Sequence, residues 1–146
     1  AQKQTNGSMD KFINEYRKII GMNIQYKNGV KEMIRLLVKG NVIGLLMDQN
    51  AGKDGVLVEF FKRKTSTPQG PAFLAITNDA PIIPMFITKT SKGVHKIIIH
   101  PYIGVKRTKD KKNDINIITE KLTKIIEEHI KEYPEEWFWL HNRWKK

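Results

Sequence analysis

Residues 60–72, FFKRKTSTPQGPA, combine side chains that bind ligands in different ways. Lys62, Arg63 and Lys64 are cations, and ammonium and guanidinium groups bind anions such as phosphate through charge-assisted hydrogen bonds. Phe60 and Phe61 offer apolar rings beside them. Two interpretations are open: a site for a ligand that is partly anionic and partly apolar, or strand phenylalanines followed by a solvated loop. The same stretch also supplies hydroxyls and a tight turn at Thr65, Thr67, Gly70 and Pro71.

The 4 histidines are the other candidates for acid–base chemistry. His95 and His100 fall in a predicted strand pair, His129 falls in a long helical pattern, and His141 lies among tryptophans, so structural roles are favoured. The chain has no cysteine and no H-E-x-x-H pattern, and the loop at 50–55, NAGKDG, lacks the G-x-x-x-x-G-K-[ST] frame of a nucleotide loop. We therefore predict neither a metal site nor a cofactor.

Length and composition limit the class of protein. A chain of 146 residues with 40% hydrophobic content fits one domain with a sizeable core. Lys and Arg number 26 against 15 Asp and Glu, a formal charge of +11, which indicates an anionic partner such as nucleic acid, anionic lipid or an acidic protein. No apolar stretch approaches the ~20 residues that span a bilayer.

The elements that must position these residues alternate between helical and strand patterns. Amphipathic helices are predicted over 9–21 and 29–40, each ending at a glycine. The apolar run at 42–49, VIGLLMDQ, is typical of a buried strand. Asp48 and Gln49 then fall at the carboxyl end of that strand, where ligands tend to bind in α/β sheets.

The second half of the chain continues the alternation. We expect a strand at 56–61, a helix at 71–79, and two strands at 80–90 and 95–103 that form a hairpin. A long helix is expected from Asp110. A final short helix from Pro134 is expected to place Trp137, Leu140 and Trp144 in the core and Trp139, His141 and Arg143 on a wet or interfacial face. The prediction is one α/β domain with a mixed β-sheet flanked by helices.

Several of these segments, taken together, resemble the lipid A biosynthesis lauroyl/myristoyl acyltransferase family, within the wider glycerolipid acyltransferase-like group. Each element is weak alone, but their order and separations agree with the family over nearly the whole chain. They are RKIIG at 17–21, Asp48 with Gln49, Phe60 with Phe61, TPQGPA at 67–72, APIIP at 80–84 and EWFWLHNRW at 136–144.

The resemblance implies an enzyme that moves a fatty acyl chain from acyl carrier protein or coenzyme A to a hydroxyl of a lipid A-type glycolipid. It implies a glycerolipid-acyltransferase-like fold and a location at the cytoplasmic face of the bacterial inner membrane. The expected partners are the acyl donor, the glycolipid acceptor and the membrane surface, without nucleic acid. The substrate-binding residues that it implies are Arg17, Asp48, Gln49, Phe60, Phe61, Lys62, Arg63, Lys64, Thr65, Thr67, Gly70 and Pro71.

One departure from the family concerns the catalytic base. The family carries an H-x-x-x-x-[DE] motif, in which the histidine takes the proton of the acceptor hydroxyl. Here no histidine is followed by Asp or Glu five positions later, so no catalytic residue is predicted. We expect residues 1–146 to be the C-terminal portion of a single acyltransferase domain, inactive in isolation, with the motif and a membrane anchor upstream.

Two other functions stay open from the sequence. A catalytically silent domain that binds lipid or carrier protein would also lack the histidine motif. A nucleic-acid-binding module would also be basic, but the cations are spread along the chain and no nucleic-acid-binding motif is present.

Overall fold

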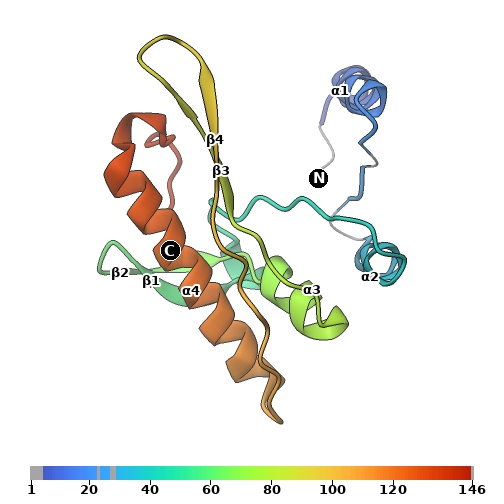
Figure 1. The fold of residues 1–146 in the computed structure, drawn as a ribbon, viewed down its shortest axis with the longest axis vertical. Coiled ribbons are helices and arrows are strands. Elements are labelled where there is room, and N and C mark those ends of the chain that lie inside the picture. Colours follow the sequence, from blue (N-terminus) through green and yellow to red (C-terminus); the bar gives the residue numbers. More distant parts are fainter. Residues whose placement is uncertain (1–4, 23, 27–28, 146) are drawn as a thin grey trace. The chain divides into compact units, whose positions relative to one another are not determined.

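The structure, a computed structural model, describes residues 5–22, 24–26 and 29–145. The chain divides into two compact units, Ala1–Ile43 and Gly44–Lys146. Figure 1 shows the course of the chain, with the first unit in blue and cyan and the second from teal to red. Among the described residues, no helix combines the length and apolar character that crossing a bilayer requires.

The first unit holds the two predicted amphipathic helices, and both predictions are confirmed. Helix α1 spans Gly7–Ile19, and its N-cap Asn6 accepts hydrogen bonds from the backbone N–H groups of Ser8 and Met9. The chain leaves this helix through Gly21, whose φ of +78° suits glycine. Helix α2 spans Val30–Val38.

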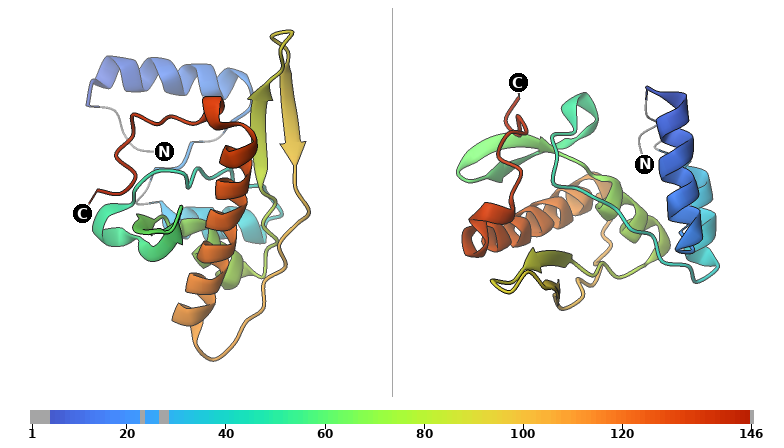
Figure 2. Two further views of the ribbon diagram at one scale, coloured as in Figure 1. Left: turned by 90° about the vertical axis from the view of Figure 1, so that its left-hand side faces the viewer. Right: turned by 90° about the horizontal axis from the view of Figure 1, so that it is seen from above.

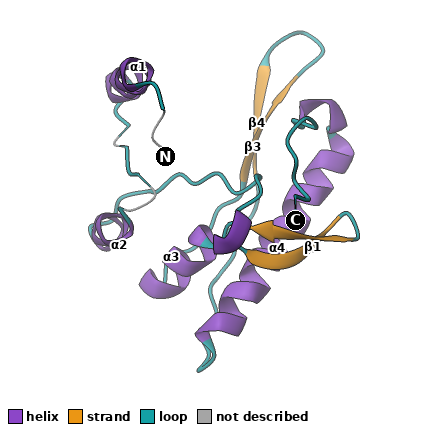
Figure 3. Ribbon diagram, turned by 180° about the vertical axis from the view of Figure 1, so that it is seen from behind, coloured by secondary structure: helices purple, strands orange, loops and turns teal. Residues whose placement is uncertain are grey.

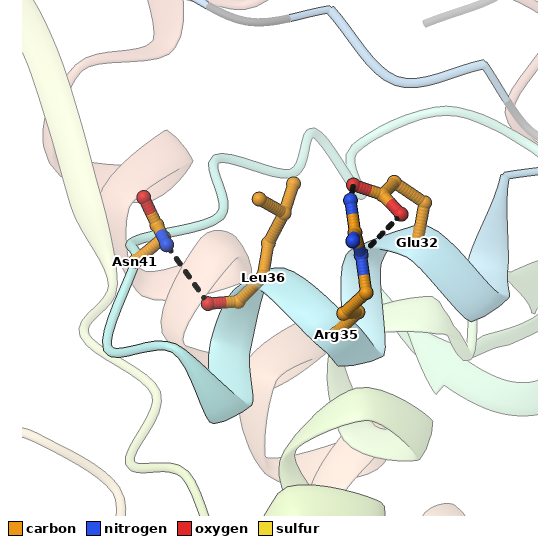
Figure 4. A network of polar contacts seen from close by, with 4 residues as sticks. All are labelled: Glu32, Arg35, Leu36 and Asn41. Carbon is orange, nitrogen blue, oxygen red and sulfur yellow. Dashed lines mark hydrogen bonds and ion pairs between the residues drawn. The ribbon is translucent and has the colours of Figure 1, made fainter.

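Helix α2 is stabilised at its surface and at its end, as Figure 4 shows. The Arg35 guanidinium donates two hydrogen bonds to the Glu32 carboxylate, at 2.8 and 2.7 Å. This pairing lowers the pKa of Glu32 below its usual value. Past the helix end, the Asn41 side chain donates to the Leu36 carbonyl oxygen at 3.1 Å, and the backbone N–H groups of Lys39 and Asn41 donate to the same oxygen.

The second unit is built on two antiparallel hairpins. Strand β1 (Val56–Phe60) pairs with β2 (Arg63–Thr67), so that Phe60 lies opposite Arg63 and the loop has two residues. Strand β3 (Met85–Lys89) pairs with β4 (His95–Ile99), which confirms the hairpin predicted over 80–103.

Two helices cover these hairpins and close the core. Helix α3 (Gly70–Asn78) begins with Pro71 in its first turn, as predicted, and helix α4 (Lys111–Glu132) is capped by Asp110, which accepts from the Asn113 N–H. Helix α4 lies between the two hairpins (Figure 2, right) and packs against both β1 and α3. The apolar residues buried together at this junction are Ala72, Ile76, Ile103, Ile115, Ile118 and Leu122.

Three predictions about the architecture are wrong. The described residues combine helices with two separate two-stranded antiparallel sheets, which agrees with the predicted α/β class, but these strands do not form the mixed sheet that was predicted. Residues 42–49 form no strand, because no described segment pairs with them, and Val42 and Leu46 are almost fully exposed. The final helix predicted from Pro134 is only a three-residue 3₁₀ turn, Pro134–Glu136. Leu140, which was expected in the core, is exposed.

Candidate functional site

The turn between β1 and β2 has an unusual backbone. Phe61 and Lys62 have φ angles of +51° and +59°, in the left-handed region. A two-residue hairpin loop of this kind requires positive φ at both positions, which Asn and Gly accept more readily than Phe and Lys. Strain of this kind costs about 1–3 kcal/mol per residue and is concentrated at functional sites. The turn is therefore a candidate for binding rather than a simple connection.

Helix α4 holds this turn in place. The Phe61 N–H donates to Glu127 Oε2 at 2.9 Å, and Glu127 Oε1 accepts from Lys131 Nζ at 2.7 Å. Burial acts to raise the pKa of Glu127, but the hydrogen bonds from Lys131 and from the Phe61 backbone outweigh it and leave the pKa lowered. Lys131 also lies 5.7 Å from the centre of the Phe61 ring. An ionised Glu127 thus fixes the strained turn.

The three predicted cations project from this turn. Lys62, Arg63 and Lys64 are all exposed, and the Arg63 guanidinium lies over the Trp144 ring at 5.2 Å. Because Lys62 lies in the turn and the other two begin β2, the positive charge is concentrated at one end of the hairpin. Such a cluster can bind a phosphate or carboxylate from solution.

Phe60, which pairs with Arg63 across the two strands, lies on the inner face of the hairpin. Its side chain is only 1% exposed, and it packs against Phe61, Trp137 and Trp144 at ring distances of 4.8, 5.9 and 5.6 Å. The Trp144 indole N–H donates to the Phe60 carbonyl oxygen at 3.2 Å. In this structure Phe60 is therefore a core residue, while Phe61 is half-buried at the turn.

Arg143 crosses beneath β2 and is only 2% exposed. Its Nη1 donates to the Ser66 carbonyl oxygen at 2.6 Å and to Thr65 Oγ1 at 2.8 Å, and its Nη2 donates to Thr67 Oγ1 at 2.5 Å. The Thr65 hydroxyl in turn donates to the Arg143 carbonyl oxygen. Both threonine hydroxyls of the predicted site thus hold the C-terminal segment. Figure 3 shows this segment returning beside the β1–β2 hairpin.

The segment around Asp48 contacts the same C-terminal residues. The Asn50 N–H donates to His141 Nε2 at 2.9 Å, and the Asn50 side chain donates to the Arg143 carbonyl oxygen at 2.9 Å. Burial lowers the pKa of Arg143 to about 10, while the negative charge of Asp48 opposes the shift. Asp48 is half-buried, and Gln49 beside it is exposed.

The structure brings most of the predicted site residues into one neighbourhood of the second unit. Gly70 and Pro71 begin α3 directly after β2. Arg17 lies in α1 of the first unit, where its guanidinium donates to Asn14 Oδ1 at 3.4 Å. The roles of all these residues in substrate binding stay predictions.

Sequence analysis missed the residues that assemble this neighbourhood. Asn50, Glu127 and His141 were not assigned to the site, and Arg143, expected on a wet or interfacial face, is buried. The only sequence signal for Arg143 was its place in EWFWLHNRW, because a partner 76 residues away leaves no local pattern. Among the described residues, no group of His, Asp and Glu is arranged to hold a metal ion.

Comparison with known proteins gives the family. The sequence profile of the family described as "Bacterial lipid A biosynthesis acyltransferase" matches residues 1–146. A phosphatidylinositol mannoside acyltransferase of Mycolicibacterium smegmatis is 26% identical over 135 residues, which cover 89% of this chain and 42% of that protein. A protein of the same name from Mycobacterium tuberculosis is 24% identical over 135 residues, which cover 89% of this chain and 41% of that protein. The chain thus spans about two fifths of these relatives, and it belongs to the bacterial lipid A biosynthesis acyltransferase family.

Proposed function

We propose that residues 44–146 supply the part of a membrane-associated acyltransferase that holds the anionic groups of its substrates. The reaction is the transfer of a fatty acyl chain from acyl carrier protein or coenzyme A to a hydroxyl of a lipid A-type glycolipid. The observation that carries the proposal is the β1–β2 turn, where Phe61 and Lys62 are held in left-handed conformations and three exposed cations project.

The proposed substrates carry chemical groups that the side chains of this turn can bind. Coenzyme A, the phosphopantetheine arm of a carrier protein and the headgroup of a lipid A-type glycolipid all carry phosphate. Lys62, Arg63 and Lys64 offer ammonium and guanidinium donors to such groups. The half-buried ring of Phe61 lies beside them and offers an apolar surface to the start of an acyl chain.

We further propose that these 146 residues alone do not carry out the transfer. The reaction needs a base for the acceptor hydroxyl, and no histidine of the chain stands five residues before Asp or Glu. Two of the histidines already have structural contacts: His141 accepts from the Asn50 N–H, and His129 stacks on Phe86 at 3.9 Å. Acyl transfer by the purified chain that disappears in a His141→Gln or His100→Gln variant would overturn this statement.

The binding proposal is tested with lauroyl-coenzyme A and lauroyl-acyl carrier protein, titrated into the chain below the concentration at which the donor forms micelles. In the triple variant Lys62→Gln/Arg63→Gln/Lys64→Gln, affinity should fall by roughly a factor of five for each lost contact, since each charged hydrogen bond contributes about 1 kcal/mol or more. The loss should shrink as salt is added.

A matched triple variant controls for net charge. Lys106, Lys109 and Lys112 are also exposed, and changing them to Gln removes the same formal charge. Lys112 and Glu127 are fifteen residues apart in α4, which is about 22 Å at 1.5 Å per residue, so the control lies far from the turn. If the two triple variants lose affinity equally, only overall charge matters and the binding proposal fails.

A further inference from the structure

Residues 138–140, Phe-Trp-Leu, stand out from the surface of the second unit. Their exposed fractions are 65%, 54% and 88%, which is unusual for three consecutive large apolar side chains. We name this segment the aromatic loop.

The exposure results from a fixed backbone. The Trp139 indole N–H donates to the Pro134 carbonyl oxygen at 2.7 Å, and the His141 N–H donates to the Phe138 carbonyl oxygen at 3.1 Å. On the far side of the loop, His141 Nε2 accepts from the Asn50 N–H. The hydrogen bonds on both sides hold the loop in a shape that presents its apolar side chains to the surroundings.

The aromatic loop lies against the cationic turn. The rings of Trp139 and Phe61 are 6.4 Å apart between centroids, and Phe61 is followed directly by Lys62, Arg63 and Lys64. The exposed Trp139 thus lies next to the turn that carries the cations. An anionic bilayer offers matching chemistry, since apolar side chains enter the acyl region while tryptophan and cations remain at the headgroups.

The shape of this surface favours a bilayer over an acidic protein. Leu140 projects from this surface and is 88% exposed. A fluid lipid surface accommodates such a projection, whereas a folded partner would need a complementary pocket.

We propose that the aromatic loop and the β1–β2 turn form a membrane-docking surface that inserts Phe138 and Leu140 into an anionic bilayer, with Lys62, Arg63 and Lys64 at the phosphates. This inference rests on the proposed function, because it places a lipid-facing surface beside the proposed substrate-binding turn. It also assigns a role to the exposed residues of EWFWLHNRW, which contribute little to the core.

The test measures sedimentation of the full chain with vesicles of phosphatidylcholine containing phosphatidylglycerol, and with vesicles of phosphatidylcholine alone. The variant Phe138→Thr/Leu140→Thr, which keeps Trp139 and its hydrogen bond, should bind the anionic vesicles at least about tenfold more weakly. The Lys62→Gln/Arg63→Gln/Lys64→Gln variant should lose roughly fivefold per cation on anionic vesicles and little on neutral ones.

A second apolar face supplies the matched control. Met85 and Ile97 lie on the outer face of the β3–β4 hairpin and are 60% and 59% exposed. The variant Met85→Thr/Ile97→Thr should bind vesicles as the unmodified chain does. The proposal is overturned if this control loses as much binding as Phe138→Thr/Leu140→Thr, or if the chain binds acyl carrier protein but no vesicles. The vesicles contain neither acyl donor nor glycolipid, so failure of vesicle binding tests the membrane-docking proposal, while the titration with lauroyl-coenzyme A tests the proposed function.

Discussion

Arg143 Nη2 donates a 2.5 Å hydrogen bond to Thr67 Oγ1 and thereby joins the C-terminal segment to β2. The guanidinium is buried, so its charge must be satisfied by the protein itself. Among the described residues, its Nη atoms find three oxygen acceptors on β2, while Nε has no hydrogen-bond partner. Because the strand that carries these acceptors begins at Arg63, we infer that Arg143 also positions the cationic turn.

Removing one of these acceptors should destabilise the protein. Thr67→Val keeps the side-chain shape but leaves a buried, charged donor without its partner, so we expect a loss of about 1–3 kcal/mol in the free energy of unfolding. Urea unfolding followed by circular dichroism measures it. Thr123→Val is the control, because the buried Thr123 hydroxyl donates to a carbonyl oxygen of its own helix, Thr119, and no charged group is involved. Equal losses in the two variants would contradict the role given to Arg143.

Any side chain at position 55, directly before β1, should lower the stability of the fold. A Cβ at this position would lie 2.2 Å from Ser66 Oγ, 2.6 Å from Ala51 Cβ and 2.8 Å from the Thr67 carbonyl oxygen. We expect Gly55→Ala to destabilise the chain by about 1–3 kcal/mol, because backbone and core atoms must move. Gly44→Ala, where nothing lies within 4 Å of the added Cβ, should have a much smaller effect in the same thermal unfolding experiment. A Gly55→Ala variant as stable as the unmodified chain would show that this segment adjusts easily.

The stacking of His129 on Phe86 predicts a dependence of stability on pH. Burial lowers the pKa of His129, and the nearby positive charge of His100 acts in the same direction, while Glu132 and Glu136 oppose the shift. The unfolded chain therefore binds a proton on this residue more readily than the folded chain does. The stabilising contribution is complete above the unfolded pKa of about 6.5 and is lost as pH falls below it.

We accordingly expect the melting temperature to fall between about pH 7 and pH 5, before most carboxylates titrate. His129→Gln should flatten this part of the profile, whereas His95→Gln, at an exposed position of β4, should leave it unchanged. A slope that persists in His129→Gln would assign the effect to another group.

The elements that sequence analysis predicted well are those whose signals are local. Asp110 caps α4 and Pro71 lies in the first turn of α3, so each boundary is encoded within a few residues of the helix that it begins. The β3–β4 hairpin follows in the same way from two apolar runs separated by a turn with Gly93 at φ +75°.

The failures have a different physical origin. The apolar run at 42–49 satisfies the pattern of a buried strand, but a strand needs a neighbour for its backbone, and none is present among the described residues. Trp137, Leu140 and Trp144 have helical spacing, yet contacts from Asn50, Thr65 and Phe60 determine the path of residues 137–145. The site depends on these long-range contacts, so its composition was partly predictable and its assembly was not.

The strained turn should trade stability against binding. Glycine adopts the left-handed conformation of residue 62 at no steric cost, so Lys62→Gly should raise the free energy of unfolding by about 1 kcal/mol. The same change removes one exposed cation and should weaken the binding of lauroyl-coenzyme A by roughly fivefold. Lys64→Gly is the control: it also removes a cation, but from a β-strand, where glycine is unfavourable, so its stability should fall. We expect the two variants to change stability in opposite directions and to lose binding to a similar extent. This result would show that the strained backbone at Lys62 is kept because its positive charge contributes to binding. If Lys62→Gly binds as tightly as the unmodified chain, the strained turn has no part in holding the donor.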